Sequence, residues 1–211
     1  MDLRLYAITD ERFMDETNIA DKVAAAIEGG VSVIQYRAKS KDSVVMYREA
    51  LIVRDVTKKY RIPFIVNDRL DIALAVSADG VHVGQTDLPV SVIRRIVGRD
   101  FIVGLSTHNL FQVENANKEE VNYIGFGPVF PTNTKKNPDP VVGVDSLCEA
   151  VKKSVHPVIA IGGINSDNIG SILMCKPAGV AVVRAVFDGD PFLNARKLRE
   201  KIDAEMGGSL S

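Results

Sequence analysis

The sequence predicts an α/β fold, a single-domain (β/α)8 TIM barrel over residues 1–206, from three observations. Short apolar runs rich in β-branched residues alternate with longer segments of helical period, a pattern typical of parallel strands joined by helices. Eight such runs in 211 residues fit a compact barrel near the lower size limit of the fold. A weak repeat, "GVSV" at 30–33, "GVHV" at 80–83 and "GVAV" at 179–182, suggests two-strand units.

The predicted strands share a short apolar core bounded by Gly, Pro or polar residues. They are residues 3–9, 31–37, 63–67, 80–84, 101–106, 123–129, 157–163 and 179–185. Residues 41–60 carry an apolar stripe at helical spacing, and similar segments separate the other strands. A doubly wound sheet would have a glycine-rich turn after its first strand, but "TDERFMDETN" contains no glycine. Residues 207–211 are predicted to be a disordered tail.

Composition and charge argue against several classes of protein. Lys and Arg number 26 against 27 Asp and Glu, so we expect neither a nucleic-acid binder nor a membrane-surface binder. No apolar run approaches membrane-spanning length, and charges interrupt the first ten residues, so we expect a cytoplasmic protein. Cys148 and Cys175 have no CxxC or zinc-site spacing, which predicts two separate thiols in a reducing compartment.

The predicted strand at 31–37 leads into "QYRAK", at the end of the barrel where TIM barrels hold their active sites. Side chains alternate across a strand, so Gln35, Arg37 and Lys39 share one face. Two cations and an amide on one face suit a polyanion such as diphosphate. A solvated basic strand end is the alternative, but Arg37 lies close to the apolar run, which favours a functional role.

The next two strand ends carry carboxylates. In "PFIVNDRLDIAL", Asn67 and Asp68 stand between a strand and a helix, where by themselves they would be interpreted as a helix cap. Asp87 follows the strand at 80–84 and also precedes a predicted helix. Adjacent strands lie about 5 Å apart, so Asp68 and Asp87 project side by side. Two carboxylates together with substrate phosphate oxygens are what Mg²⁺ typically takes.

The strands at 101–106 and 123–129 end in groups suited to anions. Ser106 could bind an anion or cap the helix that begins near Leu110. The segment "GPVFPTNTKKN" supplies hydroxyls and a cation from Thr132, Thr134 and Lys135. Such a loop can bind phosphate, and it can also be a flexible polar loop or a lid.

The last two strand ends lie where TIM barrels usually bind phosphate. Gly162 and Gly163 let the backbone approach a ligand closely, and residues 167–168 then start a helix. His82 lies within a predicted strand, where a lone histidine is more often structural, and it is not assigned to the site. His108 follows the strand at 101–106 too far out to be placed.

Taken together, these segments resemble the thiamine phosphate synthase family over nearly the whole chain. The likeness runs through "YAITD", "QYRAK", "VNDRLDIALAVSADGVHVGQTDLP", "LSTH", "GFGPVFPTNTKK", "AIGGI" and "GVAVVRAV". The third and fifth of these segments are the specific ones, whereas "AIGGI" is shared widely among phosphate-binding barrels.

The resemblance implies a set of site residues. Asp68 and Asp87 would bind Mg²⁺. The residues that contact the pyrimidine diphosphate and the thiazole phosphate would be Gln35, Tyr36, Arg37, Ala38, Lys39, Asn67, Ser106, Thr132, Asn133, Thr134, Lys135, Gly163, Val183 and Arg184. Arg37, Lys39 and Lys135 would be catalytic, because they would stabilise the departing diphosphate. The family usually has Ser or Thr where this chain has Arg184, which could pair with the thiazole phosphate or point outward.

The family joins a hydroxymethylpyrimidine diphosphate to a thiazole phosphate, or to its 2-carboxylate with loss of CO₂, and yields thiamine phosphate and diphosphate. The resemblance thus implies a Mg²⁺-dependent transferase of thiamine biosynthesis that acts on small molecules. It implies no nucleic-acid or membrane partner and allows a homo-oligomer.

Two rival functions remain open. A thiazole tautomerase of the same fold would place its catalytic histidine where this chain has Pro128. A non-catalytic, phosphate-binding regulatory barrel would have no reason to keep Asp68 and Asp87 together with Lys39 and Lys135.

Overall fold

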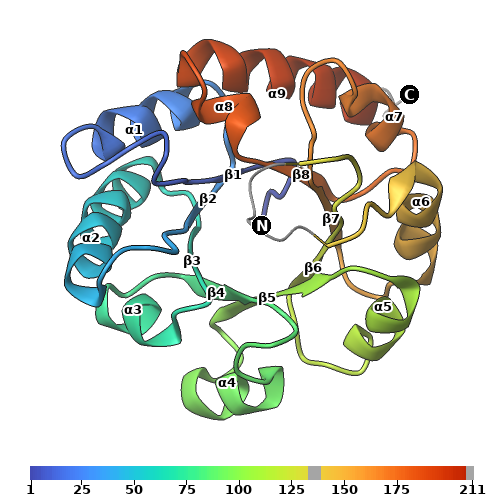
Figure 1. Cartoon of the computed structure of the whole chain (residues 1–211), viewed down its shortest axis with the longest axis horizontal. Helices are drawn as coiled ribbons and strands as arrows, with labels where there is room; N and C mark the ends of the chain where they lie inside the picture. The colour runs from blue at the N-terminus through green and yellow to red at the C-terminus, as the bar shows by residue number, and fades with distance from the viewer. Residues whose placement is uncertain (133–138, 208–211) are drawn as a thin grey trace.

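In the computed structural model, which describes residues 1–132 and 139–207, eight parallel strands close into a barrel (Figure 1). Each strand pairs with the next in chain order, and β8 pairs with β1. The strands are β1 Leu5–Ile8, β2 Val33–Tyr36, β3 Phe64–Asn67, β4 Gly80–Val83, β5 Ile102–Thr107, β6 Tyr123–Phe126, β7 Val158–Ile161 and β8 Gly179–Val182. All eight predicted strands are present and the TIM barrel is confirmed. Most strands are shorter than the apolar runs because the ends of those runs form the connecting loops.

Helices surround the barrel and cover the outer face of the strands (Figure 1). They are α1 Ile19–Glu28, α2 Ser43–Tyr60, α3 Leu70–Ala75, α4 Val90–Val97, α5 Leu110–Ala116, α6 Gly143–Lys153, α7 Ile169–Leu173, α8 Arg184–Phe187 and α9 Pro191–Gly207. The last helix packs against α1 and so joins the two ends of the chain. It takes in Gly207, the first residue of the predicted tail, and residues 208–211 lie outside the described part. No described helix combines the length and apolar content needed to cross a bilayer.

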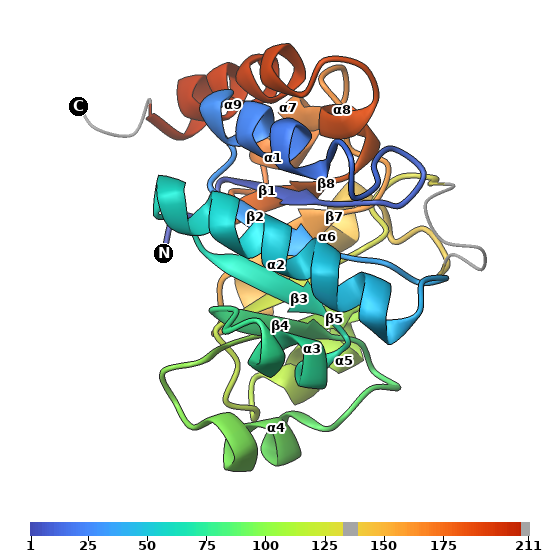
Figure 2. The ribbon, with the colours of Figure 1, turned by 90° about the vertical axis from the view of Figure 1, so that its left-hand side faces the viewer.

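Side chains of successive strand residues alternate between two apolar layers. One layer fills the inside of the barrel and includes Tyr6, Val33, Ile65 and Ile159. The other lies between the strands and the helices. Figure 2 shows the barrel from the side, with the N-terminus at one end and the loops after β1 and β2 at the other. This alternation decides which side chains at a strand end face the interior and which face a helix.

The two cysteines form a disulfide, which corrects the prediction of separate thiols. Cys148 lies in α6 and Cys175 lies two residues after α7, and their Cα atoms are 4.6 Å apart although their sequence separation is 27. The pairing depends on α6 and α7 being neighbours around the barrel (Figure 1). Sequence spacing could not show this neighbourhood, because the bond joins two helices rather than two positions of a local motif.

Candidate active site

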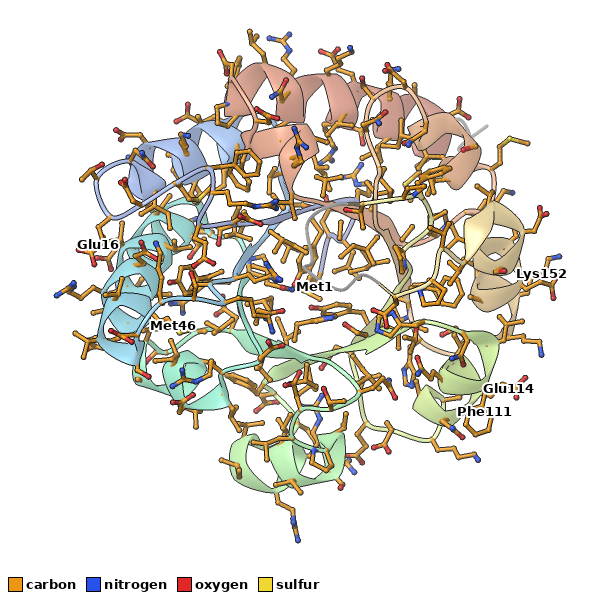
Figure 3. The ribbon with its side chains drawn as sticks, viewed as in Figure 1. Met1, Glu16, Met46, Phe111, Glu114 and Lys152 are labelled. Atoms are coloured by element: carbon orange, nitrogen blue, oxygen red, sulfur yellow. A yellow bond between two sulfur atoms is a disulfide. The ribbon has the colours of Figure 1, made fainter. Side chains whose placement is uncertain are left out.

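A cavity of about 1360 Å³ opens where the strands end, and residues following every strand contribute to its lining. Its floor includes the aromatic ring of Tyr6 from β1 and that of Tyr123 from β6. In Figure 3, side chains converge on the centre of the barrel, while Phe111 and Lys152 point outward from the surrounding helices. The predicted location of the site, at the carboxyl end of the parallel strands, is therefore where the structure has its large cavity.

The basic strand end after β2 faces this cavity. Gln35, Arg37 and Lys39 all line it, as the alternation along the strand predicts. The guanidinium of Arg37 lies 3.8 Å from the carboxylate of Asp10, and its backbone N–H donates to the hydroxyl of Thr9 at 2.9 Å. The side chain of Arg37 is 15% exposed, so this cation is held at the cavity wall rather than spread into solvent.

Asp10, which the sequence did not single out, anchors this wall from the end of β1. It is 3% exposed and accepts hydrogen bonds from the guanidinium of Arg12 at 2.8 Å from each of two nitrogens. Burial raises the pKa of Asp10, but the hydrogen bonds from Arg12 and the positive charges of Arg12 and Arg37 outweigh it, so the pKa lies below its ordinary value. Asp10 is therefore a fixed negative charge that orients two arginines.

Tyr36 and Ala38, both predicted to contact substrate, have their side chains on the other face. Tyr36 is 1% exposed and donates from its hydroxyl to Glu49 of α2 at 2.7 Å, and Ala38 is buried in the layer between strands and helices. Neither lines the cavity. Alternation along the strand turns these two side chains away from those of Gln35, Arg37 and Lys39, so the predicted contact of Tyr36 and Ala38 with substrate would be made by their backbone and stays a prediction.

Asp68 and Asp87 both line the cavity, and neither side chain caps a helix. The N-cap of α3 is Arg69 and that of α4 is Pro89, and neither cap makes a side-chain hydrogen bond. Asp68 adopts a left-handed backbone conformation, with φ of 58°, and its N–H donates to the carbonyl of His82 in β4 at 2.8 Å. The capping interpretation of these carboxylates is therefore wrong.

Each carboxylate of the pair has one neighbour that binds it. Asp68 forms an ion pair with Lys39, and Asp87 accepts the backbone N–H of Gly84 at 2.7 Å. Burial raises the pKa of Asp87, and the neighbouring negative charge of Asp68 raises it further, against the lowering effects of Gly84 and Lys39. Two carboxylates that repel one another in a half-buried site would be stabilised by a cation.

This donor set fits Mg²⁺, the metal that the family implies. Mg²⁺ commonly takes one or two protein carboxylates and completes its octahedron with waters and substrate phosphate oxygens. Among the described residues there is no group of three or more His, Cys, Asp or Glu side chains that could hold an ion. The pair of Asp68 and Asp87 therefore suits a metal shared with a substrate better than a closed protein cage.

Asn67 and Ser106 also line the cavity, from the ends of β3 and β5. The hydroxyl of Ser106 is 2.9 Å from Nε2 of His82. The cap of α5 is Asn109, whose side chain accepts the N–H of Gln112 at 2.9 Å, so Ser106 does not cap that helix. Of the two alternatives for Ser106, the helix cap is wrong, and contact with an anion stays a prediction.

Two histidines that the sequence left unassigned lie at the cavity. His82 faces inward from β4, next to Tyr123. His108 lies with Nδ1 2.6 Å from the carbonyl of Gly127 and Nε2 3.6 Å from Asp139. For His82 the alternation along "GVHVG" was an available signal, because it predicts an inward side chain between two outward valines.

The opposite wall of the cavity carries the predicted thiazole phosphate residues. Thr132, Gly163, Val183 and Arg184 line it, while Thr134 lies outside the described residues, as do Asn133 and Lys135, the latter predicted to contact the pyrimidine diphosphate. The guanidinium of Arg184 pairs with Asp188 at 2.9 Å, and its side chain is 59% exposed. Asp188 also lines the cavity, so this ion pair lies at the cavity mouth, and the choice between the two predicted arrangements of Arg184 stays a prediction.

The glycine pair after β7 serves a close approach of two loops. Gly162 and Gly163 have φ of 101° and 66°, and a Cβ at Gly163 would lie 2.5 Å from the carbonyl oxygen of Pro131. The backbone N–H of Val129 donates to Ile161 at 2.9 Å, and that of Phe130 donates to Gly162 at 3.0 Å. The glycines thus hold the loop after β6 against the loop after β7 at this wall.

Comparison with known proteins identifies relatives of this chain. The model of the thiamine monophosphate synthase family matches residues 5–186. The thiamine-phosphate synthase of Persephonella marina is 54% identical over 191 residues, covering 90% of each chain. That of a Hydrogenobaculum species is 48% identical over 182 residues, covering 86% of this chain and 85% of its own. The structure of thiamine phosphate pyrophosphorylase from Pyrococcus furiosus superposes with a TM-score of 0.89 at 37% identity, covering 98% of both chains.

The family match covers well over half of the chain, and the relatives match it over nearly its full length and theirs. The chain belongs to the thiamine monophosphate synthase family.

Proposed function

We propose that this chain is a thiamine-phosphate synthase. It joins 4-amino-2-methyl-5-(diphosphooxymethyl)pyrimidine to 4-methyl-5-(2-phosphoethyl)thiazole, or to the 2-carboxylate of that thiazole with release of CO₂. A carbon–oxygen bond to diphosphate breaks, a carbon–nitrogen bond to the thiazole forms, and the products are thiamine phosphate and diphosphate. The similarity to thiamine-phosphate synthases supports the activity, and the chemistry of the cavity supports the assignment of roles.

One observation carries the proposal: cations and carboxylates for a metal-bound diphosphate lie along one wall of a single cavity. Arg37 and Lys39 come from the end of β2, and Asp68 and Asp87 follow β3 and β4. The opposite wall carries Thr132 and Gly163, which suit a second phosphate. Two anionic substrates can therefore enter the same cavity with their reacting ends toward each other.

The chain's own residues would act mainly on the leaving group. Arg37 and Lys39 hold the diphosphate and stabilise the negative charge that develops on it as the bond to carbon breaks. Ser106 donates a hydrogen bond to the same group. Asp68 and Asp87 would hold Mg²⁺, which when bound neutralises diphosphate charge. Lys135, the third predicted catalytic cation, lies outside the described residues and keeps its role as a prediction.

Formation of the product needs no covalent intermediate with the protein. The aminopyrimidine is electron-rich, so its methylene carbon can carry cationic character once diphosphate departs. The thiazole nitrogen then attacks this carbon. What the cavity must provide is alignment of the two substrates and exclusion of competing water.

The proposal also covers the cellular location of the protein and its partners. We infer a cytoplasmic enzyme with small-molecule substrates, no nucleic-acid or membrane partner, and a fold that allows a homo-oligomer. The disulfide between Cys148 and Cys175 is unusual for the cytosol of mesophiles, although intracellular proteins of hyperthermophiles are often rich in disulfides.

The test is to mix the pure protein with both phosphorylated substrates and Mg²⁺ and to look for thiamine phosphate and diphosphate. The proposal predicts both products, with at least one form of the thiazole. Isomerisation of the thiazole carboxylate without coupling would support the tautomerase instead, although Pro128 at the cavity offers no side-chain group for proton transfer. Binding of the substrates with neither reaction would support the regulatory barrel.

A further inference from the structure

Five polar side chains from five different strands form one row across the floor of the cavity. In order they are Gln35, Tyr6, Tyr123, His82 and Ser106. The successive heavy-atom distances are 2.7 Å, 2.8 Å, 3.1 Å and 2.9 Å, all within hydrogen-bonding range. Three of the five, Gln35, Tyr6 and Tyr123, are at most 2% exposed. The row therefore links the deepest part of the cavity to the hydroxyl at the end of β5.

The central contact of this row, between His82 and Tyr123, is possible because the residue between them is a glycine. His82 of β4 is in register with Gly104 of β5, and Gly104 is in register with Tyr123 of β6. Because Gly104 has no side chain, the imidazole and the phenol stack across β5 with ring centroids 5.5 Å apart. A Cβ at Gly104 would collide with both the phenol and Nδ1 of the imidazole. Gly104 therefore leaves the space that the two rings occupy.

The direction of the hydrogen bonds follows from the number of hydrogens that each group carries. Burial raises the pKa of Tyr6 and of Tyr123, so both phenols keep their hydrogen at neutral pH. The amide nitrogen of Gln35 donates to the Tyr6 oxygen. Within the described residues the Tyr6 hydroxyl has one acceptor, the Tyr123 oxygen, so the direction that uses its hydrogen has Tyr6 donating to Tyr123 and Tyr123 donating to Nδ1 of His82.

The direction of the last hydrogen bond, between His82 and Ser106, follows in the same way. A neutral imidazole whose Nδ1 accepts a hydrogen bond carries its hydrogen on Nε2. That N–H donates to the oxygen of Ser106, the one recorded partner of this hydroxyl within the described residues. The hydrogen of Ser106 is then directed away from the histidine and toward the cavity, where Arg37 and Lys39 also lie.

We propose that Tyr6, Tyr123 and His82 are positioning residues that act through Ser106: they fix His82 as the neutral Nε2–H tautomer and thereby turn the Ser106 hydroxyl into a dedicated donor for an anionic ligand. The ligand class is a phosphate or diphosphate oxygen, which accepts hydrogen bonds and offers none when ionised. A donor held in place before the ligand arrives costs no reorganisation when charge develops on the leaving group. The inference rests on the proposed function only for the identity of that ligand.

The tautomer can be measured directly. The chain has three histidines, so ¹⁵N-resolved NMR of the imidazole rings gives few signals, and a His82→Gln variant assigns the relevant one. The expected result is a neutral ring with hydrogen on Nε2. A ring with hydrogen on Nδ1, or a charged ring, at neutral pH would overturn the proposed direction. This readout needs neither substrate nor turnover, and it uses the unmodified protein for its main observation.

Binding of inorganic diphosphate, with Mg²⁺ present throughout, tests the effect on Ser106. Replacing Tyr123 by Phe removes the hydroxyl from the middle of the row but keeps the ring, and we expect about ten-fold weaker binding by calorimetry. Tyr60→Phe is the matched control, because its hydroxyl contacts Glu28 on the surface, and it should bind as the wild type does. If Tyr123→Phe does not fold, Tyr6→Phe tests the same row one bond further from Ser106.

A double-mutant cycle separates positioning from a general loosening of the barrel. Ser106→Ala should weaken diphosphate binding, and adding Tyr123→Phe to it should cause little further loss, since the row acts through the deleted hydroxyl. Fully additive losses, or unchanged binding in Tyr123→Phe, would overturn the proposal. Either result is compatible with full thiamine phosphate synthesis by the wild type, so failure of this inference and failure of the proposed function are distinguishable.

Discussion

The ammonium group of Lys39 is ion-paired with the carboxylate of Asp68, across the ends of β2 and β3. Through Asp68 this contact joins the basic strand end to the second carboxylate, Asp87, whose pKa the charge of Asp68 raises. The cationic group and the acidic pair are thus one electrostatic unit rather than two separate sites. A metal-bound diphosphate arriving there would meet both kinds of charge at once.

Replacing Asp68 or Asp87 by Asn should abolish most Mg²⁺-dependent turnover and leave stability nearly unchanged. We expect a loss of at least about a hundred-fold in kcat, the scale of removing a group that stabilises transition-state charge. Neither side chain caps a helix, so the melting temperature should stay close to that of the wild type. Asp71→Asn, which removes an exposed partner of Arg69, is the matched control. Lowered melting temperature with intact turnover would return these carboxylates to a structural role.

Replacing Asp10 by Asn should mainly raise KM for the pyrimidine diphosphate, by about ten-fold, because Arg37 loses the carboxylate that orients it. Asp2→Asn, at a surface pair with Arg4, is the control and should leave KM unchanged. Steady-state kinetics with each substrate varied in turn make the measurement. An equal change in KM for the thiazole phosphate would contradict a role confined to the diphosphate wall.

The lowered pKa of Asp10 predicts that the stability of the protein depends on pH. The pKa of Asp10 is lower in the folded protein than its ordinary value, so its contribution is fully present above that ordinary value and is lost as pH falls through the lowered one. Urea unfolding of the wild type and of Asp10→Asn should therefore differ at pH 6, and the difference should shrink steadily as the pH falls below ~3.9, the ordinary pKa of Asp. A difference that persists unchanged in acid would mean that the charge of Asp10 is not what stabilises the fold.

Reduction of the disulfide should lower stability without direct effect on the chemistry. The bond between Cys148 and Cys175 closes a loop with a sequence separation of 27, for which chain entropy predicts a stabilisation of roughly 3.5 kcal/mol. Unfolding by urea with and without a thiol reductant measures the difference, and Cys148→Ser should abolish it. Two thiols that alkylate readily in the native protein without reductant would restore the prediction made from the sequence.

Gly163→Ala should disturb the contact between the loops after β6 and β7. Its left-handed φ and the 2.5 Å approach to the carbonyl of Pro131 leave no room for a methyl group, so we expect a loss of roughly 1–3 kcal/mol in stability. KM for the thiazole phosphate should rise more than KM for the pyrimidine diphosphate. Gly170→Ala is the matched control, because a Cβ there meets nothing within 4 Å. Equal behaviour of the two variants would remove the special role of Gly163.

The barrel and much of its site could be predicted because both depend on local pattern. Eight apolar runs gave eight strands, and alternation along "QYRAK" placed Gln35, Arg37 and Lys39 on the cavity side. The same alternation would have excluded the side chains of Tyr36 and Ala38, which entered the prediction as part of a contiguous motif. Alternation thus separates the residues whose side chains face the cavity from those whose side chains face a helix.

What the sequence missed depends on packing between distant segments. Tyr6 and Tyr123 are 117 residues apart, and their contact follows from the closure of the barrel rather than from any local spacing. The disulfide likewise depends on α6 and α7 being neighbours. His82 was predictable as an inward residue. Its contact with Tyr123 was not, because that contact requires the space left by Gly104 on the strand between them.

Release of diphosphate as a function of the second substrate tests the central claim most directly. The account predicts that wild-type protein with the pyrimidine diphosphate and Mg²⁺ releases diphosphate in step with thiamine phosphate when the thiazole phosphate is added, and that removal of Mg²⁺ by a chelator stops both. Turnover of the thiazole alone, or binding of both substrates with no diphosphate released in the presence of Mg²⁺, would contradict it.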